Sequence, residues 1–162
     1  MHDSARDDAA RLLAARPLTE AELRTRLTRG GHAAHAVETA LREALQAGWL
    51  DDMAVAREVL RSGLAQGRGK ERLLAQLLSR GIAPELAEAA WDALLASGDV
   101  DPEAGLRAQV ERRVRAAGGT LTGRAAARIY NALLRSGHDP ESVKSALAPY
   151  VRAGLGDDDD FP

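Results

Sequence analysis

The chain has 162 residues, enough for one ordinary domain or for a series of smaller modules that pack on one another. Hydrophobic residues make up 45% of it but aromatic residues only 3%, and this scarcity of sheet-forming side chains excludes a β-rich fold and predicts an all-α protein. The lack of cysteine excludes disulfides and thiolate chemistry, while the net charge of −2 conceals an uneven distribution of charge.

The same residues predict the compartment. No run of about 18 apolar residues is present, and the N-terminal MHDSARDDAARLL is acidic and polar where a secretory signal would be basic and then apolar. A chain without cysteine also fits a reducing environment. The sequence therefore predicts a cytoplasmic protein with no membrane partner.

Glycines indicate an internal repeat. Three pairs are each separated by 17 residues: Gly31 and Gly48, Gly81 and Gly98, Gly137 and Gly154. Apolar residues recur at fixed distances after the first glycine of each pair. Six places after it lie Val37, Ala87 and Val143; ten places after it lie Leu41, Trp91 and Leu147; fourteen places after it lie Leu45, Leu95 and Val151. Others lie eight and four places before it, namely Leu23, Leu73 and Ile129, then Leu27, Leu77 and Leu133. These spacings are typical of helices, so each repeat contains a helix on either side of its first glycine.

Residues 4–50 are predicted to form the first repeat. A helix over about residues 4–15 precedes a second helix that begins at a T-x-x-E capping box, Thr19 and Glu22, and ends at Gly31. The third helix lies between Gly31 and Gly48. Each glycine stands where a left-handed residue would close the preceding helix.

Residues 51–100 and 101–155 are predicted to form the second and third repeats. Their first helices cover about residues 52–65 and 102–117, and their third helices begin at Ala83-Pro84-Glu85 and Asp139-Pro140-Glu141, with proline in the first turn. Residues 156–162, with four consecutive Asp at 157–160, are predicted to form a disordered, solubilising acidic tail.

The pattern lacks the residues that catalysis would need. His32 and His35 could share a helix face, but no third ligand has the spacing of a zinc site. Gly69-Lys70 is similar to part of a phosphate-binding loop, yet the first glycine of that motif is missing and Glu71 replaces the Ser or Thr that would bind magnesium. The sequence predicts no enzyme, no metal site and no cofactor.

The few aromatic residues have mostly structural interpretations. Trp91 occupies a position that is Leu in the other two repeats and is predicted to lie in the core. Trp49 is predicted to pack against the helix end at Gly48. Tyr130 is the one aromatic residue predicted to lie on an exposed basic face. A single aromatic side chain is too few for binding single-stranded DNA by base stacking.

Basic residues concentrate in the second and third repeats. Residues 107–135 hold seven Arg and a single acidic residue, Glu111. One arginine alone is typical of a solvated helix face, but a cluster indicates a binding face, because guanidinium groups bind carboxylate and phosphate bidentately. The candidate binding residues are Arg68, Lys70, Arg72, Arg80, Arg112, Arg113, Arg115, Arg124, Arg128 and Arg135.

Several segments in this order resemble the RecX family of regulators of the RecA recombinase. They are TEAELRTRLTRGG at 19–31, GWLDD at 48–52, GRGKERLLAQLLSRGI at 67–82, APELAEAAWDAL at 83–94 and TGRAAARIYNALLRSGHDPESV at 122–143. The resemblance implies three tandem three-helix repeats, curved into an elongated monomer that binds within the groove of the RecA filament on single-stranded DNA. It also implies inhibition of strand exchange, of the associated ATPase and of the co-protease function that triggers the SOS response.

Two alternatives remain open at this point. A DNA-binding protein could act through a basic helical face without RecA, by phosphate contacts to single-stranded or double-stranded DNA, although a pI of about 6.1 is low for a dedicated DNA binder. A purely structural adaptor would show neither activity. Weak contact with DNA is also compatible with the RecA interpretation.

Overall fold

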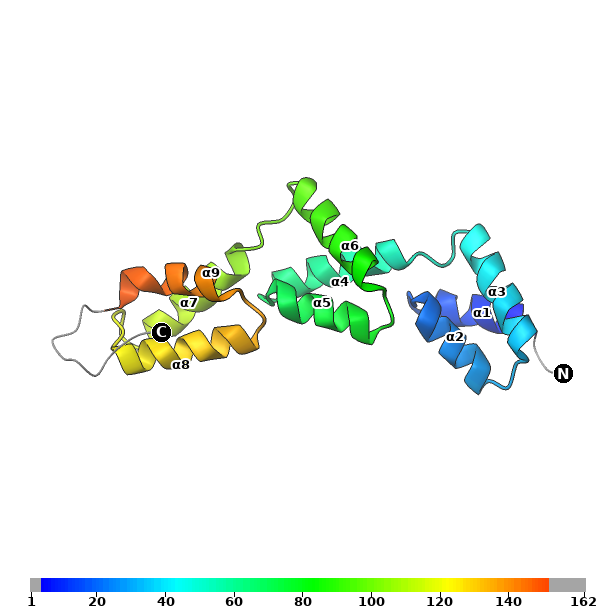
Figure 1. The fold of residues 1–162 in the computed structure, drawn as a ribbon, viewed down its shortest axis with the longest axis horizontal. Helices are drawn as coiled ribbons and strands as arrows, with labels where there is room; N and C mark the ends of the chain where they lie inside the picture. The colour runs from blue at the N-terminus through cyan, green and yellow to red at the C-terminus, as the bar shows by residue number, and fades with distance from the viewer. Residues whose placement is uncertain (1–3, 152–162) are drawn as a thin grey trace. The chain divides into compact units, whose positions relative to one another are not determined.

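The structure, a computed structural model, describes residues 4–151, in which helices are joined by short loops (Figure 1). The helices come in three successive sets of three, which confirms the predicted all-α fold of three-helix repeats. Their bounds are α1 Ala5–Ala15, α2 Glu20–Arg29, α3 Ala34–Gln46, α4 Asp52–Ala65, α5 Lys70–Ser79, α6 Pro84–Ala96, α7 Ala104–Ala116, α8 Gly123–Arg135 and α9 Pro140–Leu147, followed by a short 3-10 helix at Ala148–Tyr150. The acidic segment 156–162 lies outside the described residues.

Local side-chain chemistry places the helix ends where the sequence predicted them. The Thr19 side chain accepts a hydrogen bond from the Glu22 amide, and the Glu22 side chain accepts one from the Thr19 amide, so the capping box is complete. Asp139 caps α9 with Pro140 in the first turn. Five of the six repeat glycines have positive φ values between 70° and 85°: Gly31, Gly48, Gly81, Gly98 and Gly137. Gly154 lies outside the described range.

The first repeat has its own core, made where α1, α2 and α3 pack on one another. Its largest contributors are Leu18, Leu23, Leu27, Leu41 and Leu50, each 3% exposed or less. Apolar residues four or seven places apart on each helix turn toward this core, as the helix period predicted.

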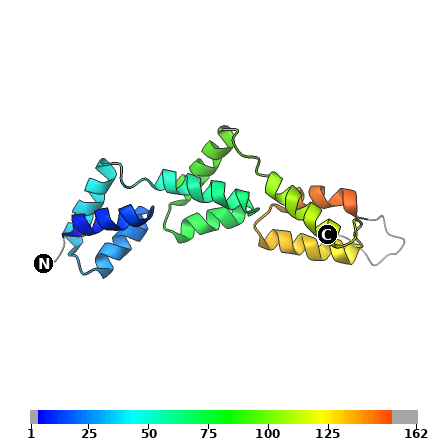
Figure 2. The same cartoon turned by 180° about the vertical axis from the view of Figure 1, so that it is seen from behind.

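The third repeat is built in the same way from α7, α8 and α9, which lie side by side in both ribbon views (Figures 1 and 2). Its core includes Leu106, Val110, Leu121, Leu133 and Leu147. Tyr130 is also buried there, at 8% exposure. The prediction that Tyr130 lies on an exposed basic face is therefore wrong, because its position on α8 faces the core.

The middle repeat contributes to two compact units. One unit comprises residues 4–59 with 76–93 of the described chain, and the other comprises residues 60–75 with 94–151. Leu60, Leu73 and Leu77 are fully buried, and Trp91 is buried at 6% exposure, as predicted for a core position.

One part of the predicted apolar pattern is wrong. Leu45 and Leu95, fourteen places after the first glycine of their repeats, are 47% and 39% exposed. The residues just before them, Ala44 and Leu94, are buried instead. A helix of 3.6 residues per turn returns to the core three residues after Leu41, so the next position has already rotated outward.

Consecutive repeats meet through the ends of their second helices, in the same way in each compact unit. In one unit the Thr19 hydroxyl, just before α2, donates to the Arg80 carbonyl at the end of α5, at 2.7 Å. In the other, the Gly69 amide, just before α5, donates to the Ser136 carbonyl at the end of α8, at 2.9 Å. The C-terminus of one helix thus meets the N-terminus of another, an arrangement that helix dipoles favour.

Candidate functional site

Helix α8 presents a row of exposed arginines. Arg124, Arg128 and Arg135 fall within about 40° of one another on a helix that turns about 100° per residue. Ala126, Tyr130 and Leu133 occupy the opposite, buried face. The helix is set by its ends, since the Thr122 side chain accepts a bond from the Ala125 amide and Gly137 closes the C-terminus with a φ of 84°.

A fourth arginine, from another repeat, extends this row. The Nη1 of Arg72, in the first turn of α5, lies 3.5 Å from the carbonyl oxygen of Arg135. We call Arg72, Arg124, Arg128 and Arg135 the arginine stripe. All four are exposed, and none of them forms an ion pair with a carboxylate among residues 4–151. From Arg124 to Arg135 the stripe extends for about 16 Å along α8.

Two glycines bring Arg72 next to α8. The Gly69 amide donates to Ser136, and the Glu71 amide donates to the Gly137 carbonyl at 3.2 Å. A β-carbon at Gly69 would overlap the carbonyl group of Gly137. The close approach of these two backbones therefore requires glycine at position 69.

A buried histidine completes this junction. The Nε2 of His138 lies 2.9 Å from the carbonyl oxygen of Gly67, to which the Gln109 amide also donates. Burial lowers the pKa of His138. Because a carbonyl oxygen can only accept, Nε2 is the donor in this bond, and His138 thus binds the turn between α4 and α5.

The remaining candidate residues of this unit are placed less favourably. Arg112 and Arg115 on α7 are exposed and Arg113 is half-buried, and none of the three has an ion-pair partner within the described chain. Arg68 and Lys70 are half-buried, and each already interacts with another group of the protein. The contacts of the structure connect Arg72 with α8, but they do not connect the α7 arginines with the stripe.

Arg80 belongs to the other compact unit and has a partner of its own. Its Nε and Nη2 lie 2.9 Å from the two carboxylate oxygens of Glu22, a bidentate ion pair, and its side chain is only 20% exposed. Hydrogen bonds from Arg80 lower the pKa of Glu22. Because its charge is already matched, we leave Arg80 out of the arginine stripe.

The ion pair between Glu22 and Arg80 is expected to contribute measurably to stability. Glu22→Gln should lower the free energy of unfolding by about 1–2 kcal/mol at neutral pH, because it removes a charge-assisted bidentate pair. A carboxylate with a lowered pKa stabilises the fold above its unfolded pKa, and this contribution disappears as the pH falls through its folded pKa. Urea unfolding at about pH 7 and about pH 3 should therefore show a smaller difference in stability between variant and wild type at the lower pH.

Glu43→Gln is the matched control for this measurement. The Glu43 carboxylate lies 3.4 Å from Arg6 in a pair whose side chains are 40% and 66% exposed. Such an exposed pair contributes little. An equal loss of stability from both variants would contradict a special role for Glu22.

A second basic surface, not predicted from the sequence, lies on the first repeat and the end of α5. Arg16, Arg26, Arg29 and Arg80 line a hollow of about 340 Å³ beside α2 and the end of α5. Arg26 and Arg29 lie three residues apart on α2 and are exposed. Their spacing without an intervening acid is the sequence signal for this surface, but the density of basic residues along the chain pointed only to the later repeats.

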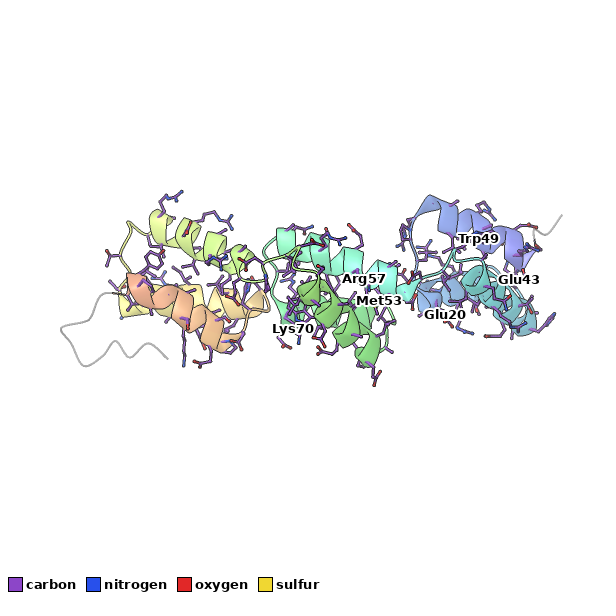
Figure 3. The ribbon with its side chains drawn as sticks, turned by 90° about the horizontal axis from the view of Figure 1, so that it is seen from above. Glu20, Glu43, Trp49, Met53, Arg57 and Lys70 are labelled. Atoms are coloured by element: carbon purple, nitrogen blue, oxygen red, sulfur yellow. The ribbon has the colours of Figure 1, made fainter. Side chains whose placement is uncertain are left out.

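Trp49, labelled in Figure 3, is half-exposed, which corrects the expected packing at a helix end. Its amide closes α3 by donating to the Ala44 carbonyl at 2.9 Å, but the residue buried after Gly48 is Leu50. The indole borders two hollows of about 510 and 360 Å³.

The two histidines of the first repeat do not form a metal site. The Nε2 of His32 lies 2.7 Å from an oxygen of Asp8, while His35 is exposed. Residues 4–151 contain no group of three or more His, Cys, Asp or Glu placed to hold a metal ion. None of the described helices is long and apolar enough to cross a membrane.

The fold and the arginine stripe together define a tandem array of three-helix repeats with a basic surface formed by α8 and the first turn of α5. Residues 5–43 match the family model described as "RecX, first three-helix domain". The regulatory protein RecX of Halorhodospira halophila is 35% identical over 146 residues, which cover 90% of this chain and 88% of that protein. The regulatory protein RecX of Chromohalobacter salexigens is 38% identical over 87 residues, 54% of this chain and 57% of that protein. The chain belongs to the RecX family.

Solved structures agree with this assignment at the level of the fold. The crystal structure of RecX from Lactobacillus salivarius superposes with a TM-score of 0.79 over 90% of this chain and 94% of that one, at 16% identity. A second crystal structure of a regulatory protein RecX gives a TM-score of 0.74 over 90% of this chain and 70% of that one, at 18% identity.

Proposed function

We propose that this protein regulates the RecA recombinase by binding the RecA filament on single-stranded DNA. Binding inhibits the ATPase, strand-exchange and co-protease activities of the filament. The protein thus acts where RecA acts, in the cytoplasm, and takes part in DNA repair, recombination and the SOS response. Its membership of a family of regulatory proteins supports this proposal. It acts as a monomer by binding, without catalysis, metal or cofactor.

The arginine stripe is the observation that carries the binding proposal. Its exposed guanidinium groups have no carboxylate partner among the described residues, so they are available to an acidic surface. A nucleoprotein filament offers both protein carboxylates and DNA phosphates, and arginine binds either one bidentately. Further positive charge in the same unit comes from Arg112, Arg113 and Arg115 of α7, from Arg68 before α5 and from Lys70 at the start of α5.

A repeat array suits this task for a physical reason. Each repeat contacts its neighbours through short helix-end junctions, so the chain can offer several separate binding surfaces. Weak contacts to adjacent filament subunits then combine to raise the overall affinity, although no single contact is tight. Such a protein can hold neighbouring subunits together or block their extension.

The test is ATP hydrolysis by the RecA of the same organism on single-stranded DNA, titrated with this protein. We expect inhibition at protein levels well below one molecule per RecA subunit, because a molecule that contacts several subunits affects all of them. No inhibition by folded protein would overturn the proposal. Tight, steeply salt-dependent binding to bare DNA in its place would favour a DNA-binding protein that acts without RecA.

A further inference from the structure

The arginine stripe has a candidate occupant within the same chain. Four consecutive aspartates, at 157–160, follow the described residues. They match the four arginines of the stripe in number and are opposite to them in charge.

The last described residues are held at the N-terminal end of α8. The Leu121 amide donates to the Tyr150 carbonyl at 2.8 Å, and Leu121 forms an isolated bridge with Val151. Leu121 itself is buried in the core of the third repeat, against which Tyr150 and Val151 pack. Val151 is therefore held beside Leu121, and Leu121 precedes Arg124 by three residues.

The chain beyond Val151 is long enough to reach the stripe. Asp157 and Asp160 follow Val151 by six and nine residues, which can span at most about 20 and 30 Å. Arg124 and Arg128 lie in the first two turns of α8, within about 10 Å of its start along the axis. The aspartates can thus reach both arginines without full extension.

We propose that Asp157–Asp160 docks on the arginine stripe of its own chain and competes there with an acidic partner. A short tether gives the aspartates a high effective concentration at the stripe, on the millimolar scale for flexible linkers. Each exposed ion pair is weak and is screened by salt, so the segment occupies the stripe in part of the molecules and lowers its affinity without closing it. The contact depends on no property of RecA and stands apart from the proposed function.

Paramagnetic relaxation tests the contact directly. The chain has no cysteine, so Gly156→Cys provides a single position for a nitroxide label. We expect the label to broaden the backbone amide signals of Arg124 and Arg128 more strongly than a free tether at Val151 would, and we expect this broadening to weaken at high salt. Replacement of all four aspartates by asparagine in the labelled chain should weaken it in the same way.

Two further variants locate the contact. Arg124→Gln with Arg128→Gln should reduce the broadening along α8 to that of the asparagine variant, whereas Arg42→Gln with Arg57→Gln should leave it unchanged. Arg42 and Arg57 are exposed and, like the stripe, have no carboxylate partner in the described chain. If the labelled chain with its four aspartates shows no more broadening than the asparagine variant, the proposal is overturned. Broadening that grows with protein concentration would also overturn it, since the segment of a second copy would then be the occupant.

Competition gives a second measurement with a defined probe, a fluorescent oligo-dT strand. If the segment occupies the stripe in two thirds of the molecules, its neutralisation to asparagine tightens binding about threefold at low salt. The effect should be absent in the Arg124→Gln, Arg128→Gln background. An equal gain in both backgrounds would mean that the aspartates repel DNA from a distance, and would contradict docking on the stripe.

Discussion

Gly69→Ala is expected to destabilise the protein by about 3 kcal/mol, because a methyl group there cannot coexist with the junction between α5 and α8. The added β-carbon would overlap the backbone carbonyl of Gly137, which cannot rotate away as a side chain could. To relieve the overlap, the helix ends must separate and lose the amide hydrogen bonds from Gly69 and Glu71. For a chain of this size we expect the melting temperature, followed by circular dichroism, to fall by about 10 °C.

Gly98→Ala separates this steric effect from ordinary glycine chemistry. Gly98 has a φ of 70°, but a β-carbon there would meet no atom within 4 Å. Its replacement should therefore cost only the left-handed backbone penalty, about 1–2 kcal/mol. If Gly69→Ala lowers the free energy of unfolding less than Gly98→Ala does, the junction accommodates the methyl group, which would contradict our interpretation of the contact.

Reversal of two charges in the arginine stripe is expected to have the largest effect on activity. Arg124→Glu with Arg128→Glu should raise the concentration needed for half-inhibition of RecA ATP hydrolysis at least tenfold, since one lost charge-assisted contact is already worth about 1.5–3 kcal/mol. Both side chains are exposed on a face opposite the core, so the helical circular dichroism spectrum should not change.

The matched control is Arg42→Glu with Arg57→Glu, which makes the same change of net charge elsewhere. We expect this variant to inhibit nearly as well as the wild type. Full inhibition by the stripe variant would remove the stripe from the binding surface. An equal loss in both variants would mean that net charge, and not the stripe, governs binding.

The candidate site was only partly predictable from the arginines themselves. The sequence indicated a basic cluster, and the period of α8 was sufficient to place Arg124, Arg128 and Arg135 on one face. It could not exclude Arg80, whose partner Glu22 lies 58 residues earlier in the chain. The density of charge along the sequence also did not point to Arg26 and Arg29, because the hollow that they line forms only when α2 and the end of α5 pack together.

The core shows the same limit on a smaller scale. Most of the apolar positions that recur between the repeats are buried, as Leu23, Leu73 and Leu133 illustrate. Leu45, Leu95 and Trp49 are not, although they are as hydrophobic as the residues that are buried. Burial depends on whether a neighbouring helix covers the position, and composition does not report that.

The sequence by itself determined the helices, their ends and their threefold repetition, because these depend on contacts between residues at most a few positions apart. A capping box, a proline in the first turn and a left-handed glycine are each complete within one helix end. Only the tertiary structure decided which charges meet, since Arg72 reaches Arg135 across 63 residues and Gly69 reaches Ser136 across a similar span. Such pairings follow from how packed helices orient their ends, and local propensity carries no information about them.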